Sequence, residues 1–135
     1  PLVQVASLSG LARQLRSIGA SSGPRWRASE NWDIDPDVLA NWTETAAAGL
    51  AHAVVSACAL IDFEAVLIDG WIPAGLRGAL VAAVERHLDR QNLTGLQRPQ
   101  VIPGTVGADA RSLGAACLPL TERFLTDTSG SLPQP

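Results

Sequence analysis

Apolar positions recur at helical spacing in the first half of the chain. Ser7 has a hydroxyl group that can cap a helix over 8–18, where leucines and Ile18 fall on one face. Asp35 and Pro36 form a second helix start, because aspartate accepts from free backbone N–H groups and proline at the first position loses no hydrogen bond. This apolar period continues to residue 61. The sequence therefore predicts helices over 8–18 and 36–61, with residues 19–32 as a surface loop.

Two short apolar runs in the second half predict strands. Ala65 to Ile68 lies between acidic and turn residues, which is typical of a buried parallel strand with Leu67 at its middle. Residues 99–103 form a shorter run with proline at both margins. The intervening helix is marked by Leu76, Leu80, Val84 and Leu88. Arg77 is expected on its outer face.

A last helix is predicted over 108–124, and Pro119 is expected to kink or shorten it. The order of helix, long helix, strand, helix, strand and helix indicates the α/β class, with helices over both faces of the sheet. Two strands do not make a stable sheet alone, so we expect further residues to complete it. The chain opens with Pro1 instead of methionine, which favours a longer natural protein.

Composition sets the class of protein. The 135 residues are 47% hydrophobic, enough to bury the core of one domain over 1–125, with a polar tail over 126–135. The formal net charge is only −3 and no Lys/Arg cluster is present, so the chain offers no electrostatic footprint for nucleic acid or an anionic membrane. The apolar run 46–61 is shorter than the roughly 18 residues that spanning requires. With no secretory signal at the start, a cytoplasmic location is expected.

Cysteines and histidines offer little chemistry. Cys58 and Cys117 each lie in an apolar context on a predicted helix, so small buried thiols are favoured over a disulfide. Neither has the partner cysteine that a zinc knuckle needs. His52 and His87 lie on different predicted helices, where a lone histidine is usually packed or solvated. No metal ligand is assigned.

Other candidates also favour structural explanations. Asp33, Asp35 and Asp37 alternate as in a calcium loop, but the glycine and distal glutamate of that motif are missing, so helix capping is favoured. Trp26 could stack on a ligand or base, yet a tryptophan folded onto the surface is the more common case. Ser112 lacks a nucleophile elbow, and the glycine pair at 104 and 107 is too short for a phosphate loop.

Two segments resemble a known family. The strand segment 62–70, DFEAVLIDG, resembles the corresponding segment of the ROK family (repressors, open reading frames and sugar kinases), and residues 107–116, GADARSLGAA, are similar to its closing segment. With the opening helix at Ala6-Ser7-Leu8, the similarity covers nearly the whole chain. It implies the C-terminal portion of an actin-like ATPase domain of the ribonuclease H-like, sugar-kinase type, helix-rich with a small, incomplete sheet.

The turn after the first strand departs from that family. ROK sugar kinases have a run of glycines here, against which the adenosine of ATP lies. In this chain the turn is Asp69-Gly70-Trp71, whose carboxylate and indole should obstruct or repel a nucleotide. The family's catalytic aspartate, phosphate loops and Cys-rich zinc motif have no counterpart. We therefore expect no catalytic residue and no cofactor in this segment.

The resemblance implies a cytoplasmic bacterial transcriptional regulator. Its expected partners are a sugar effector, further copies of itself bound through the C-terminal helices, and DNA bound through a helix-turn-helix that precedes this segment; no membrane is expected. Two alternatives stay open, the C-terminal part of an ATP-dependent ROK sugar kinase and a free-standing protein-interaction module. The residues upstream of the segment would distinguish a regulator from a kinase.

Overall fold

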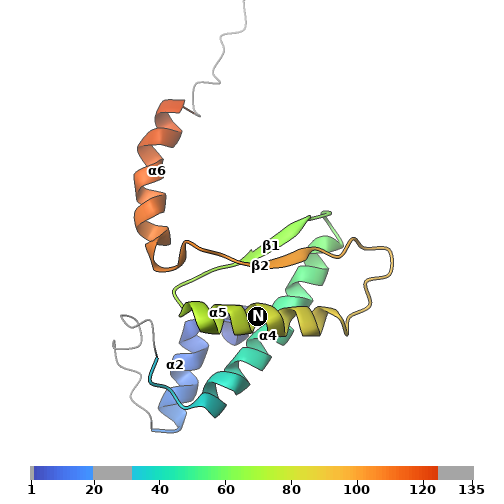
Figure 1. The fold of residues 1–135 in the computed structure, drawn as a ribbon, viewed down its shortest axis with the longest axis vertical. Helices are drawn as coiled ribbons and strands as arrows, with labels where there is room; N and C mark the ends of the chain where they lie inside the picture. The colour runs from blue at the N-terminus through green and yellow to red at the C-terminus, as the bar shows by residue number, and fades with distance from the viewer. Residues whose placement is uncertain (1, 20–31, 125–135) are drawn as a thin grey trace, which may run out of the picture.

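The computed structural model describes residues 2–19 and 32–124 (Figure 1). Its elements are α1 (Leu2–Val5), α2 (Leu8–Ser17), α4 (Pro36–Cys58), β1 (Ala65–Ile68), α5 (Ala74–Leu88), β2 (Gln100–Pro103), η1 (Gly107–Asp109) and α6 (Ala110–Phe124). Most of the predicted loop, with Trp26, and the predicted tail 126–135 lie outside the described residues.

The predicted helix starts are confirmed. The Ser7 hydroxyl accepts a hydrogen bond from the backbone N–H of Gly10 at 3.2 Å, and α2 begins at Leu8. Asp35 Oδ1 accepts from the backbone N–H of Asp37 at 2.8 Å, with Pro36 as the first residue of α4. The aspartates before α4 thus include a helix cap, as expected.

Helix α4 ends at Cys58, three residues before the predicted position 61. The backbone N–H groups of Leu60 and Ile61 both donate to the carbonyl of Ala57 at 3.0 Å, so the last turn tightens and the helix closes. Leu60 and Ile61 are exposed. Their apolar side chains extended the sequence period without contributing to the buried face.

Strands β1 and β2 form a parallel pair connected through α5. Ala65 pairs with Gln100 and Ile68 with Pro103, so every residue of β1 has a partner in β2. A parallel pair needs such a crossover, which α5 supplies. The helix-rich α/β class is confirmed, and in the described residues the sheet has two strands.

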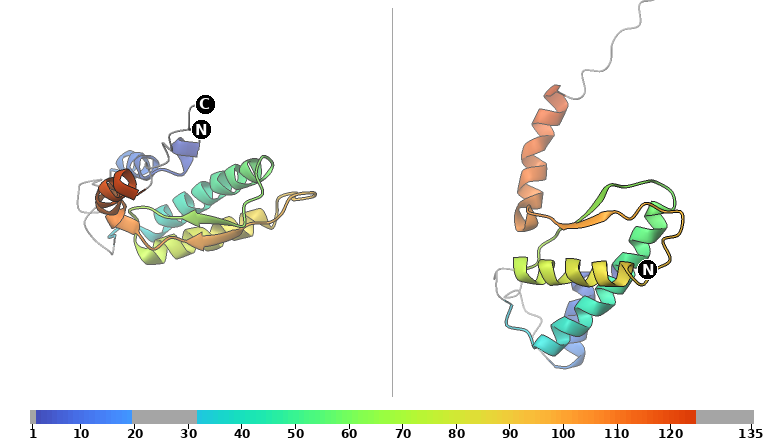
Figure 2. Two further views of the ribbon diagram at one scale, coloured as in Figure 1. Left: turned by 90° about the horizontal axis from the view of Figure 1, so that it is seen from above. Right: turned by 45° about the vertical axis from the view of Figure 1, so that its right-hand side comes forward.

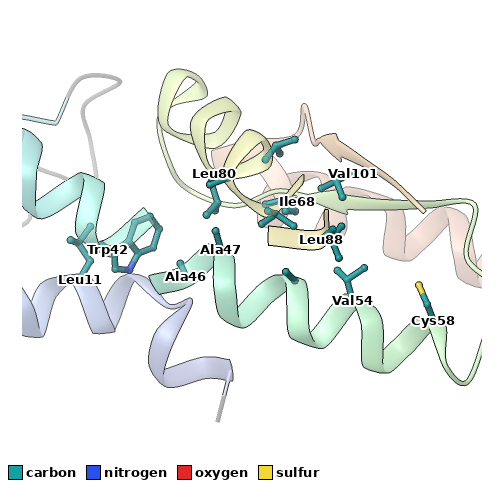
Figure 3. Close-up of a cluster of buried hydrophobic side chains, with 14 of the residues drawn as sticks. Leu11, Trp42, Ala46, Ala47, Val54, Cys58, Ile68, Leu80, Leu88 and Val101 are labelled. Carbon is teal, nitrogen blue, oxygen red and sulfur yellow. The ribbon is translucent and has the colours of Figure 1, made fainter. Parts of the chain in front are cut away.

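The core lies between α4, α5 and the inner face of the sheet, and it extends between α4 and α2 at Trp42 and Leu11 (Figure 3). Alanines along α4 let α5 approach closely, and the larger side chains fill the remaining space. The buried hydrophobic residues of this cluster are Leu11, Leu15, Trp42, Ala46, Ala47, Ala51, Val54, Cys58, Ile68, Leu80, Val81, Ala83, Val84, Leu88 and Val101. Burial of this cluster is the main stabilising contribution of the fold.

The prediction that Leu67 is buried between helices is wrong. Leu67 is 68% exposed and pairs with Ile102, which is 38% exposed, whereas Ile68 and Val101 are each 8% exposed. Side chains alternate along a strand, and here the even positions of β1 face the core. The other face of the sheet carries an uncovered apolar pair, Leu67 and Ile102.

The two ends of the described chain differ from expectation. Helix α1 was not predicted; it packs against α4 at Gly49, where an added Cβ would lie 2.7 Å from Val5 Cγ2. Helix α6 projects away from the α4 and α5 layer in Figure 1 and in the right-hand view of Figure 2, and it is not shortened by Pro119. The prediction of two buried cysteines is half wrong. Cys58 is buried, but Cys117 is exposed because α6 stands away from the core.

Candidate functional site

The carboxyl ends of the two strands lie at one edge of the sheet. Asp69 follows β1 directly and Gly104 follows β2 directly, and the parallel register brings them together. Ligands of open α/β sheets bind at the carboxyl ends of the strands. This edge holds the Asp69-Gly70-Trp71 turn that the sequence singled out, together with Arg77. We call Asp69, Arg77, Gly104, Val106 and Gly107 the Asp69 cluster.

The Asp69 carboxylate accepts hydrogen bonds from backbone N–H groups on two turns. Its Oδ1 accepts from Gly70 at 2.8 Å and from Gly107 at 3.0 Å, and its Oδ2 accepts from Val106 at 3.1 Å. Arg77 Nη1 donates to Oδ1 at 2.5 Å and completes the set. The Gly70 hydrogen bond, followed by those from Gly107, Val106 and Arg77, holds the pKa of Asp69 below its ordinary value despite partial desolvation.

Arg77 connects the two strand ends. Its Nη1 also donates to the carbonyl oxygen of Gly104 at 2.7 Å, and the residue is only 9% exposed. The prediction that Arg77 lies on the outer face of its helix is therefore wrong. Helical side chains lean toward the N-terminus of their helix. Arg77 is in the first turn of α5, so it reaches back to the end of β1.

Two glycines make room for the cluster. A Cβ at Gly104 would lie 2.5 Å from both Cβ and Cγ of Asp69, far inside van der Waals contact. Gly107 has φ +56°, a backbone conformation that side chains disfavour, and this bend turns its N–H toward Asp69. The spacing Gly104-x-x-Gly107 thus serves the close approach of Asp69.

The chemistry available to Asp69 is limited. Successive backbone N–H groups with a nearby arginine form the kind of concavity that binds an external anion, and here the carboxylate of the chain itself occupies it. An aspartate with its pKa lowered and both oxygens engaged is a poor general base. Trp71, two residues on, is 47% exposed beside the turn. The cluster fastens the β2–η1 turn to the β1–α5 turn.

The remaining candidates lie apart from this edge. His87 Nε2 lies 3.1 Å from Glu44 Oε2, and Arg86 Nη2 lies 2.5 Å from Glu44 Oε1. These two side chains of α5 therefore both contact the same carboxylate of α4. The His87 hydrogen bond, followed by the hydrogen bond and charge of Arg86, holds the pKa of Glu44 below its ordinary value. His52 is exposed on α4, and Ser112 is exposed on α6.

In the described part of the chain, no three His, Cys, Asp or Glu side chains are grouped so that they could hold a metal ion. Within the same residues, no helix is long and apolar enough to span a membrane.

No protein-family model, curated protein or solved structure matches this chain. The family relationship that the sequence resemblance implies therefore stays a prediction.

Sequence reasoning found Asp69 and missed Arg77. An arginine among apolar residues on an amphipathic helix is typical of a solvated face, and its partners lie 8 and 27 residues away in the chain. A usable signal was its position. A basic residue in the first turn of a helix, where the macrodipole disfavours it, suggests a carboxylate partner.

Proposed function

We propose that this chain is a non-catalytic assembly module and the C-terminal part of a ROK-type transcriptional regulator, with an actin-like domain as its larger fold. The observation that carries the proposal is the uncovered apolar face of the sheet. Leu67 and Ile102 are neighbours across the strand pair and both are exposed. Parallel sheets in α/β proteins are usually covered on both faces, so this pair marks a surface that is covered in the assembled protein.

The occupant that we propose for this face is a second copy of the chain. The two strands also have unpaired outer edges in the described residues, and unpaired apolar edges are templates for association. Helix α6 adds exposed Leu113 and Leu118 away from the core. These features support self-association, which suits a regulator that binds DNA as an oligomer through a domain outside this segment.

The Asp69 cluster argues against the kinase alternative. A nucleotide at the carboxyl ends of the strands would need the backbone N–H groups that Asp69 already occupies. A bound phosphate would also meet the negative charge of the carboxylate. Titration of the chain with magnesium-ATP should therefore give no saturable heat, and micromolar binding would restore the kinase as the better hypothesis.

Leu67→Asp combined with Ile102→Asp tests the assembly surface. The carboxylates of one copy would face those of the other across the proposed interface, so sedimentation velocity over a range of concentrations should show association in the parent and monomers in the variant. Ala79→Asp combined with Ala82→Asp is the matched control, because it adds the same two charges at exposed positions of α5. A parent that stays monomeric, or a Leu67 and Ile102 double variant that associates like the parent, would contradict the proposal.

A further inference from the structure

Helix α6 carries an exposed apolar stripe. Its described side chains, over 112–119, are all exposed. Leu113, Ala116 and Cys117 recur at spacings of three and four, which places them on one side of the helix, and the sequence continues this spacing at 120 and 124. A helix of 15 residues is marginally stable in water by itself, and Pro119 removes one of its backbone hydrogen bonds. The stripe of α6 therefore needs a surface to pack against.

The outer sheet face, which carries Leu67 and Ile102, is too small to hold two copies together alone. Each strand has four residues, and alternate residues point to the core. Stable interfaces bury roughly 800 Å² per partner, contributed by about 20 to 30 residues on each side. Direct contact between two such faces falls well short of this area. Association through the outer sheet face therefore requires a further element from each copy.

Helix α6 has the length and the chemistry to cover this face. Its 15 residues extend about 22 Å, whereas a four-residue strand extends about 13 Å, so one helix spans the whole face. Parallel sheets in α/β proteins are usually covered by helices on both faces, and α4 and α5 already cover the inner one. An apolar helix on the outer sheet face would complete the missing layer.

The Asp69 cluster directs α6 away from its own sheet. Residues 104–109 connect β2 to α6, and within them the backbone N–H groups of Val106 and Gly107 donate to Asp69. The N–H of Asp109 donates to the Val106 carbonyl at 3.2 Å and tightens the same turn. As a result α6 stands beyond the carboxyl end of β2 and does not lie over the sheet (Figures 1 and 2). Folding back would break these hydrogen bonds, whereas a second copy can offer its sheet without changing them.

We propose that the apolar stripe of α6 packs on the outer sheet face of a second copy, and that two copies exchange these helices reciprocally. The inference rests on the proposed assembly function and names the segment that covers the face. In a two-fold symmetric pair every contact occurs twice, so each copy gives one helix and receives one. The interface then contains two sheet faces and two α6 helices, which brings it toward the area that a stable dimer requires.

Single charges on opposite sides of α6 test the exchange by sedimentation velocity. Leu113→Asp places a carboxylate in the apolar stripe and should raise the dissociation constant of the dimer at least about tenfold. Ala115→Asp is the matched control, because Ala115 is exposed on the other side of the same helix; its dissociation constant should stay within about threefold of the parent value. No described residue of α6 belongs to the buried core, so neither variant should disturb the core.

Cross-linking between two different chains distinguishes exchange from folding back. A chain with Ile102→Cys and Cys117→Ser is mixed with the unchanged chain, and a flexible bismaleimide should link its new thiol to the exposed Cys117 of the other chain. Cys58 is buried and does not compete. Ala82→Cys with Cys117→Ser is the matched control at an exposed position of α5 and should give only background linkage. Mass spectrometry identifies the linked thiols.

The outcomes separate this inference from the proposed function. If Leu67→Asp with Ile102→Asp gives monomers while Leu113→Asp associates as the parent does, the face still forms an interface but another segment covers it, and the exchange is overturned. Equal weakening by Leu113→Asp and Ala115→Asp, or linkage of the Ile102→Cys chain no stronger than that of the α5 control, also overturns it. If the parent is monomeric, or if the double variant of the sheet face associates normally, the proposed function and this inference fail together.

Discussion

Asp69 and Arg77 form an ion pair, with 2.5 Å between Oδ1 and Nη1, at the point where both strands end. Their side chains are 27% and 11% exposed, so Arg77 is shielded from solvent while the Asp69 carboxylate stays partly open to it. Arg77 also holds the Gly104 carbonyl, and Asp69 holds the N–H groups of Val106 and Gly107. One pair thereby connects the end of β1 and the first turn of α5 to the turn after β2, and its loss should loosen this edge of the sheet.

Arg77→Ala should lower the free energy of unfolding by about 1 to 3 kcal/mol, because it leaves the buried Gly104 carbonyl without its donor and the Asp69 carboxylate without its cation. Urea unfolding at neutral pH measures this. Arg90→Ala is the control; Arg90 is exposed, and its change should stay within about 0.5 kcal/mol. If both variants unfold at the same urea concentration, Arg77 lies on a solvated face after all.

Acid should weaken the fold through Asp69. Its pKa is lower in the folded chain than the ordinary value of about 3.9, so its contribution is present above pH 4 and is lost as pH falls through the folded pKa. Asp69→Asn should be less stable than the parent at pH 7, and its stability should fall less steeply below pH 4. Urea unfolding midpoints measured as a function of pH test this. Glu44, whose pKa is also lowered, leaves a residual slope in the variant. An unchanged acid slope in Asp69→Asn would contradict the assignment.

Removing the carboxylate should create a site for an external one. In Asp69→Ala the N–H groups of Val106 and Gly107 and the Arg77 guanidinium lose their acceptor, so formate should bind in its place. Formate should raise the melting temperature of the variant above that in sodium chloride of equal ionic strength, because a ligand of the folded state stabilises it. The parent should show no such difference. Equal responses in both proteins would mean that the N–H groups do not form an anion site.

Two glycine substitutions should act in opposite directions. Gly104→Ala places a methyl group 2.5 Å from Asp69 Cβ, and overpacking of this kind costs about 1 to 3 kcal/mol. Gly78 lies within α5 with open space around its Cβ position, so Gly78→Ala should stabilise by about 0.5 to 1 kcal/mol through helix propensity. Thermal melts of the two variants compare them directly. A destabilised Gly78→Ala would show that the α5 surface is covered.

Local signals predicted most of the elements, and long-range contacts decided the rest. The starts of α2 and α4 followed from Ser7 and from Asp35-Pro36, because a cap needs only its own neighbours. Helix α1 escaped prediction because four residues are too few to show a period. The position of Arg77 could not be predicted, because its burial depends on partners brought near only by folding of the β1–α5–β2 unit.

The orientation of β1 was also beyond the sequence. Ala65 to Ile68 is apolar at every position, so alternation gives no sign of which face is buried. Polar residues at alternate positions would have identified the outer face. The structure places Ile68 inside and Leu67 outside, and these neighbours therefore provide a direct test of the fold.

Ile68→Asp should prevent folding, whereas Leu67→Asp should change the free energy of unfolding by about 1 kcal/mol or less. An aspartate at position 68 would be buried without a cation and would either stay charged at a cost of several kcal/mol or be forced to protonate. At position 67 it would be solvated, and only strand propensity opposes it. Thermal melts at low protein concentration, where association does not contribute, compare the two variants. If Leu67→Asp fails to fold while Ile68→Asp melts like the parent, the strand faces the other way and the uncovered surface lies elsewhere.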